Sequence, residues 1–166
     1  MATFTERMKG AAFLNVETYQ EVETDIDGTA QAATVVALGA LATAIGAGEW
    51  GLTHMIVGVL GSLLSWVIAA AITSFIGVTL LGGTATWSEM LRTLGFAQAP
   101  AIVLVLGIVP GVMIVLGPIV VVWLLFTQFI AIREALDVSN GRAFLTAVLA
   151  WMASIIPRAL LTGGLG

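Results

Sequence analysis

Long runs of apolar residues, separated by short polar stretches, make up the chain from residue 28 onward. A helix of about twenty apolar residues is long enough to cross the hydrocarbon core of a bilayer. The pattern predicts five such helices, at about residues 28–47, 55–81, 89–109, 113–135 and 141–161. We therefore expect residues 28–166 to form one all-α integral membrane domain, a bundle of five transmembrane helices.

The stretch between residues 92 and 133 holds no charged residue and is too long for one crossing. Pro110 and Gly111 lie near its midpoint and form a natural turn, so we place the turn between the third and fourth helices there. Gly117 and Pro118 are a rival turn that would shorten the fourth helix. If Pro118 lies within that helix instead, it is expected to kink the helix near its start.

The basic residues are sorted along the chain, and their order indicates the direction of each crossing. Cytoplasmic loops of membrane proteins carry an excess of Lys and Arg. Five crossings with the N-terminus inside leave only Arg158 near the far side of the membrane. The remaining basic residues all fall on the cytoplasmic side: Arg7, Lys9, Arg92, Arg133 and Arg142. We therefore predict a cytoplasmic N-terminus.

Composition agrees with a membrane domain that follows an acidic tail. Hydrophobic residues make up 59% of the chain and charged residues 10%, whereas soluble domains are about 25% charged. The net charge of −4 lies entirely in residues 1–27, which argues against nucleic acid as a partner. Within this tail we expect a short amphipathic helix at residues 3–14 and a second short helix that starts at Thr18. The favoured interpretation is a solvated, weakly helical surface segment, and the alternative is a partner-binding tail.

The sequence offers no constellation of catalytic, cofactor-binding or metal-binding residues. Cysteine is absent and His54 is the single histidine, so neither a thiolate site nor a closed metal site can be assembled. Nothing resembles a Ser–His–Asp arrangement or a phosphate-binding loop. We predict no catalytic site, no cofactor and no metal.

Charged residues gather at the predicted cytoplasmic ends of the third, fourth and fifth helices. They are Glu89, Arg92, Arg133, Glu134, Asp137 and Arg142. The favoured interpretation is an interfacial ion-pair cluster that anchors the helix ends, with Glu89 and Arg92 paired at i, i+3. The alternative is a docking face or a gate.

Small residues recur at every fourth position of the second predicted helix. They are Gly61, Ser65, Ala69, Thr73 and Gly77. Small side chains let membrane helices approach closely, so we interpret the stripe as helix packing within one chain. The alternative is a seam between copies of the protein.

Several segments together resemble the Yip domain family, five-pass membrane proteins named for interacting with Ypt/Rab GTPases. The first is the acidic element at residues 13–23 (FLNVETYQEVE), and the second is residues 87–100 (WSEMLRTLGFAQAP). Trp123, residues 131–136 (AIREAL) and residues 141–143 (GRA) complete the match. The similarity covers nearly the whole chain and is closest to the compact prokaryotic members of the family.

The resemblance implies a non-catalytic integral membrane protein with five helices, a cytoplasmic N-terminus and a place in a prokaryotic cytoplasmic (inner) membrane. Eukaryotic relatives act in membrane traffic and have a longer N-terminal cytosolic region. The short acidic tail of this chain departs from that pattern, which argues against a Rab-type GTPase as partner.

Two functions of different classes follow from these observations. The first is a non-enzymatic membrane adaptor, trafficking, membrane-organising or assembly factor that contacts the lipid bilayer and binds another membrane protein or itself. The alternative is a small oligomeric channel or transporter, suggested by the small-residue stripe, the prolines in the third and fourth helices, and Gln98 and Gln128. A membrane enzyme ranks third, because it needs a paired acid and base or metal ligands within the bundle.

Overall fold

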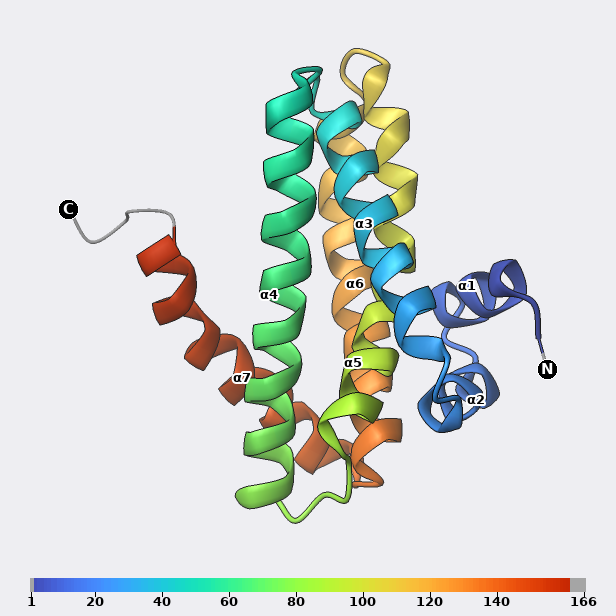
Figure 1. Ribbon diagram of the computed structural model, residues 1–166, viewed down its shortest axis with the longest axis vertical. Helices are drawn as coiled ribbons and strands as arrows, with labels where there is room; N and C mark the ends of the chain where they lie inside the picture. Colours follow the sequence, from blue (N-terminus) through green and yellow to red (C-terminus); the bar gives the residue numbers. More distant parts are fainter. Residues whose placement is uncertain (1, 162–166) are drawn as a thin grey trace.

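The computed structural model describes the backbone of residues 2–161 and the side chains of residues 2–153. The all-α prediction is confirmed, because the described residues form seven α-helices and one 3-10 helix, arranged as Figure 1 shows. They are α1 (Phe4–Ala12), α2 (Val16–Thr24), α3 (Gly28–Gly46), α4 (Leu52–Thr79), α5 (Trp87–Phe96), η1 (Ala99–Ile108), α6 (Val112–Leu136) and α7 (Asn140–Leu161).

Four segments within the described residues are long and apolar enough to cross a membrane. They are α3, α4, the combined segment Trp87–Ile108 and α6. Large apolar side chains cover the outer surfaces of α4 and α6, where Leu60, Leu125 and Phe126 are exposed. Such surfaces are stable when lipid surrounds them.

The helix α7 is inclined to the bundle and packs beside α4 and α6 through its N-terminal half (Figure 1). Ala143, Thr146 and Ala150 form its buried face. The side chain of Arg158 lies outside the described residues. The count of five crossings requires α7 as the fifth, and it stays a prediction.

The third predicted helix, at residues 89–109, is a joined pair of segments, α5 and η1, and not one α-helix. Pro100 has no amide hydrogen, and the Ala101 amide donates to the Gln98 carbonyl at 2.9 Å, as in a 3-10 turn. The Ala97 carbonyl, which Ala101 would occupy in an α-helix, accepts a hydrogen bond from Thr127 Oγ1 at 2.8 Å. A polar side chain of α6 thus satisfies the backbone at the break, as a membrane segment requires.

The chain reverses between η1 and α6 at Pro110 and Gly111. Gly111 has a left-handed φ of 83°, a conformation that glycine adopts without steric cost. The rival turn is not used, because Pro118 lies inside α6.

The helices α3 and η1 pack closely against each other. A Cβ atom added at Gly46 would lie 1.9 Å from the Leu104 carbonyl oxygen, and one at Gly39 would lie 3.1 Å from Ala101 Cβ. The α3 residues Ala32, Gly39 and Gly46 repeat every seven positions, and Ala32 lies against Gly95 in the same way. Small residues on α3 therefore allow this packing.

The small-residue stripe predicted for α4 does not form one packing face. Thr73 and Gly77 are buried, and Gly77 lies against Leu136, but Gly61 faces open space. An α-helix has 3.6 residues per turn, so positions four apart drift by about 40° at each step. The C-terminal end of the stripe, at Thr73 and Gly77, consequently faces the bundle, while its N-terminal end at Gly61 faces outward.

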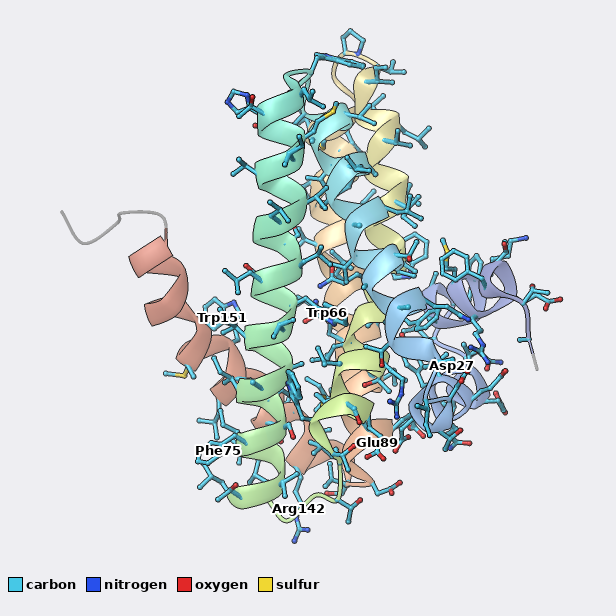
Figure 2. All side chains as sticks on the ribbon, viewed as in Figure 1. Asp27, Trp66, Phe75, Glu89, Arg142 and Trp151 are labelled. Carbon is cyan, nitrogen blue, oxygen red and sulfur yellow. The ribbon has the colours of Figure 1, made fainter. Side chains whose placement is uncertain are left out.

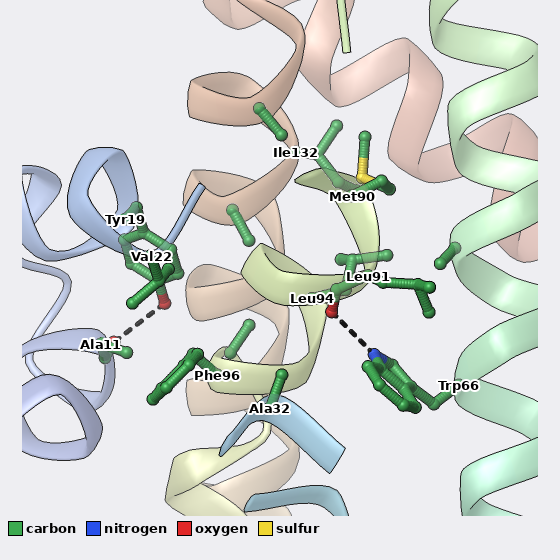
Figure 3. Packing of buried hydrophobic residues seen from close by; sticks show 14 of the residues in the cluster. Ala11, Tyr19, Val22, Ala32, Trp66, Met90, Leu91, Leu94, Phe96 and Ile132 are labelled. Carbon is green, nitrogen blue, oxygen red and sulfur yellow. Dashed lines mark hydrogen bonds between the residues drawn. The ribbon is translucent and has the colours of Figure 1, made fainter. Parts of the chain in front are cut away.

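The acidic N-terminal segment is part of the hydrophobic core, contrary to the solvated surface segment that we predicted. Ala11, Tyr19 and Val22 are fully buried, and they pack beside Met90 and Phe96 of α5 (Figure 3). Six acidic residues dominate the composition of the tail and mask this apolar face, because Tyr19 and Val22 share one side of α2 while Glu17 and Glu21 occupy the other.

Candidate docking face

The helices α1 and α2 form an N-terminal hairpin whose ends are closed by their own side chains. Thr3 and Glu6 make a capping box at the start of α1. The Asn15 side chain caps α2 by accepting a hydrogen bond from the Thr18 amide at 2.8 Å. The second helix therefore begins at Val16, and our prediction of a start at Thr18 was wrong because Asn15 is the capping residue.

Arg7 ties this hairpin together from a buried position. Its guanidinium is 2% exposed, and it contacts Glu21 at 2.9 Å and Asp25 at 2.5 Å. A third hydrogen bond, 3.1 Å long, runs from Arg7 to Gln31 at the beginning of α3. Hydrogen bonds from Arg7 lower the pKa values of the Glu21 and Asp25 carboxyl groups. One buried cation thus links α1, the end of α2 and the first membrane-length helix.

Arg92 attaches the hairpin to the bundle from α5. Its side chain is 5% exposed, and its Nε donates to the carbonyl oxygens of Val22 and Glu23, both at 3.0 Å. These carbonyls belong to the C-terminal turn of α2, where a cation is favourable. The predicted Glu89–Arg92 pair does not form, because α2 covers Arg92 and Glu89 accepts a hydrogen bond from the Thr86 amide at 2.7 Å as part of a capping box.

Glu23 lies where α2 meets the ends of α5 and α6, within electrostatic reach of three other carboxylates. Burial raises the pKa of Glu23 to about 7, and the charges of Asp137, Glu89 and Glu134 add to that rise. Gln20 of α2 also donates a 3.1 Å hydrogen bond to Glu134. We call Glu23, Glu89, Glu134 and Asp137 the acidic face, and the end of the bundle that carries it the acidic end.

The six charged residues that the sequence grouped together all lie at the acidic end, but they do not form one ion-pair network. Arg133 and Glu134 make a 2.5 Å salt bridge, and Asp137 accepts a 3.3 Å hydrogen bond from Thr84. Arg142 is exposed at the far tip of this end, away from Glu89 (Figure 2). In the part of the chain that the structure describes, no cluster of His, Asp or Glu is placed to hold a metal ion.

Five residues of the hairpin that were not predicted as site residues also take part in these contacts: Arg7, Gln20, Glu21, Glu23 and Asp25. One signal was available for Arg7. At helical spacing it shares a face with Phe4, Met8 and Ala11, so an arginine falls among apolar residues. No comparable local signal marks Glu23, whose neighbours come from α5 and α6.

The fold and its docked hairpin define an all-α, multi-pass integral membrane protein. A model of the Yip1 domain matches residues 16–161, and the chain belongs to this family. The resemblance inferred from the sequence is therefore confirmed. Yip1 family members are generally non-enzymatic membrane trafficking proteins. The match begins at the first residue of α2 and extends through α7. Searches of curated proteins and of solved structures gave no match.

Proposed function

We propose that this protein is a non-enzymatic adaptor of a prokaryotic cytoplasmic membrane, which holds another membrane protein through its acidic face. In this proposal α7 is the fifth crossing, and the N-terminus and the acidic end lie in the cytoplasm. The distribution of arginines along the sequence supports that orientation. The proposal involves no Rab-type GTPase, because α1 and α2 are engaged in packing against the bundle.

The placement of Glu23, Glu89, Glu134 and Asp137 at one end of the bundle carries the proposal, since Gln20 of α2 bonds to Glu134 there and Thr84 bonds to Asp137. The nearby arginines do not neutralise them all, since Arg92 is bound to backbone carbonyls beneath α2 and Arg133 is paired with Glu134. The surface that remains is anionic and close to the membrane.

Another membrane protein can supply the complementary positive charge at the same depth relative to the membrane. The positive-inside rule places Lys and Arg next to the cytoplasmic ends of membrane helices. We therefore expect the partner to dock a basic juxtamembrane segment against the acidic face. Complementary charge of this kind sets the register of a complex and speeds its formation more than it raises affinity.

Site-specific photo-crosslinking in native membranes tests the proposal. Trp87 is 50% exposed at the acidic end, and Trp50 is 60% exposed at the opposite end, so p-benzoylphenylalanine replaces an aromatic residue at either position. The Trp87 probe is expected to give an adduct with another membrane protein, and the Trp50 probe is not.

Charge neutralisation provides the second arm of this experiment. Glu89→Gln keeps a capping box, and Asp137→Asn keeps a residue that tolerates the left-handed conformation. Together with Glu134→Gln, these substitutions should abolish the Trp87 adduct, whereas the control Glu49→Gln should retain it. An adduct that survives neutralisation, or one formed only with a second copy of this chain, would contradict the proposed adaptor role.

A further inference from the structure

The turn between α1 and α2 exposes two large apolar side chains at the tip of the N-terminal hairpin. Phe13 is 76% exposed and Leu14 is 37% exposed. Leu14 also has a left-handed φ of 61°, which a leucine adopts at a conformational cost that glycine avoids. An exposed leucine side chain gains no burial free energy in water that would offset this conformational cost. A leucine at this position becomes favourable when an apolar environment surrounds the tip.

The tip lies against the middle of a membrane-length helix. The ring of Phe13 is 6.2 Å from that of Trp123, and Trp123 Nε1 donates a 2.7 Å hydrogen bond to the Ala12 carbonyl. Trp123 follows Val112, the first residue of α6, by about 16 Å at 1.5 Å per residue. The distance to the other end of α6, at Leu136, is about 20 Å on the same basis.

On one flank of Trp123, the neighbouring α6 residues are apolar and exposed. Ile119 lies four positions before it and Phe126 three positions after it, and both are open to the surroundings of the bundle. In a membrane-crossing helix this surface contacts lipid. The exposed tip of the hairpin is therefore continuous with a lipid-facing surface.

The backbone carbonyl groups at the end of α1 are all hydrogen-bonded within the protein, as a lipid environment requires. The last four carbonyls of a helix have no partner within the helix, yet in α1 each one accepts a hydrogen bond. Phe13, Asn15 and Leu14 amides bond to the carbonyls of residues 9, 10 and 11 in the Schellman pattern. Tyr19 Oη donates a second bond to the Ala11 carbonyl at 2.9 Å (Figure 3), and Trp123 completes the set at Ala12.

We propose that Phe13 and Leu14 insert into the acyl chains of the bilayer leaflet beside α6, so that the N-terminal hairpin is anchored in lipid as well as on the bundle. The exposed Lys9 lies on the preceding turn, and its long side chain lets its charge extend toward the headgroups while the tip contacts acyl chains. The partner of this surface is lipid, and the proposal does not depend on the adaptor function.

The absence of native cysteine allows a direct test with single spin labels. Variants Leu14→Cys and Phe13→Cys place the label at the tip. Phe126→Cys is the matched lipid-facing control on α6, and Thr24→Cys is the exposed control on α2. Each labelled full-length protein is reconstituted into vesicles of phosphatidylethanolamine and phosphatidylglycerol. Collision with oxygen, which dissolves in lipid, is compared with collision with a water-soluble nickel chelate.

The two tip labels are expected to behave like the label at residue 126, with nickel collision about tenfold or more below that at residue 24 and oxygen collision above it. Two tip positions guard against a local fold defect, because only Leu14 has the left-handed backbone. Hydrogen exchange of α2 in each labelled variant verifies that the hairpin stays docked. Nickel collision at both tip positions as high as at residue 24, in a docked hairpin, would overturn the proposal.

Discussion

Removal of the buried guanidinium of Arg7 should release the N-terminal hairpin from the bundle. Arg7→Met keeps an unbranched apolar chain of similar length but deletes the contacts to Glu21, Asp25 and Gln31. Loss of one partner from a buried ion pair costs about 3–5 kcal/mol. Glu21 is 32% exposed and regains water, whereas Asp25 is 14% exposed and does not regain it fully. We therefore expect the lower limit, about 3 kcal/mol.

Hydrogen exchange of the α1 and α2 amides, measured on the protein in nanodiscs, reports the free energy of opening. A loss of about 3 kcal/mol corresponds to exchange that is about a hundredfold faster or more. Lys9→Met is the matched control, because it removes one positive charge from the exposed side of the same helix. The double variant Arg7→Met/Asp25→Asn should lose less than the sum of the single effects, since the two side chains contact each other. Equal exchange in Arg7→Met and Lys9→Met would refute the assignment of Arg7 as the residue that holds the hairpin.

Three further predictions concern the titration of the acidic face and the packing of the membrane helices. The pKa of Glu23 is raised from its ordinary value of 4.5 to about 7, so the docked hairpin binds a proton more tightly than the undocked one. Its protection from exchange should fall as pH rises from about 5 to 8, and Glu23→Gln, but not Glu17→Gln, should remove that fall. Gly46→Ala introduces a methyl group beside the Leu104 carbonyl and should lower stability in detergent by about 1–3 kcal/mol. Gly61→Ala, at an open position, should be neutral or stabilising by up to about 1 kcal/mol; equal melting temperatures would contradict the close approach of α3 and η1. Thr127→Val leaves the Ala97 carbonyl without its partner and should cost about 1 kcal/mol. The same change at the exposed Thr34, which bonds within its own helix, should have little effect, and comparable losses at both positions would argue against the role of Thr127 at the helix break.

The positions of the membrane helices follow from sequence because local pattern determines them. Apolar runs of sufficient length produce α3, α4 and α6, and Pro110 with Gly111 produces the turn. The break between α5 and η1 had a local signal in Pro100, but its stabilisation by Thr127 comes from thirty residues away.

The docked hairpin depends on contacts that no local pattern reveals. Arg92 bonds to carbonyls about seventy residues earlier, and Trp123 bonds to a carbonyl 111 residues earlier. These partners are backbone atoms, which have no sequence signature. Gly61 and Gly77 of the α4 stripe lie on different sides of the helix for a geometric reason, since a four-residue period does not follow one face of a helix with 3.6 residues per turn.

We expect the acidic face to lie on the cytoplasmic side of the membrane, where a basic flank of another membrane protein can reach it. The most direct test labels single cysteines in intact cells with a thiol reagent that does not cross the membrane. Ser139→Cys lies in the α6–α7 connection at the acidic end, and Thr53→Cys lies in the first turn of α4 at the opposite end, both exposed. We predict that the cysteine at position 53 reacts and the one at position 139 does so only after the membrane is permeabilised. Labelling at position 139 in intact cells would place the acidic face outside and contradict the account.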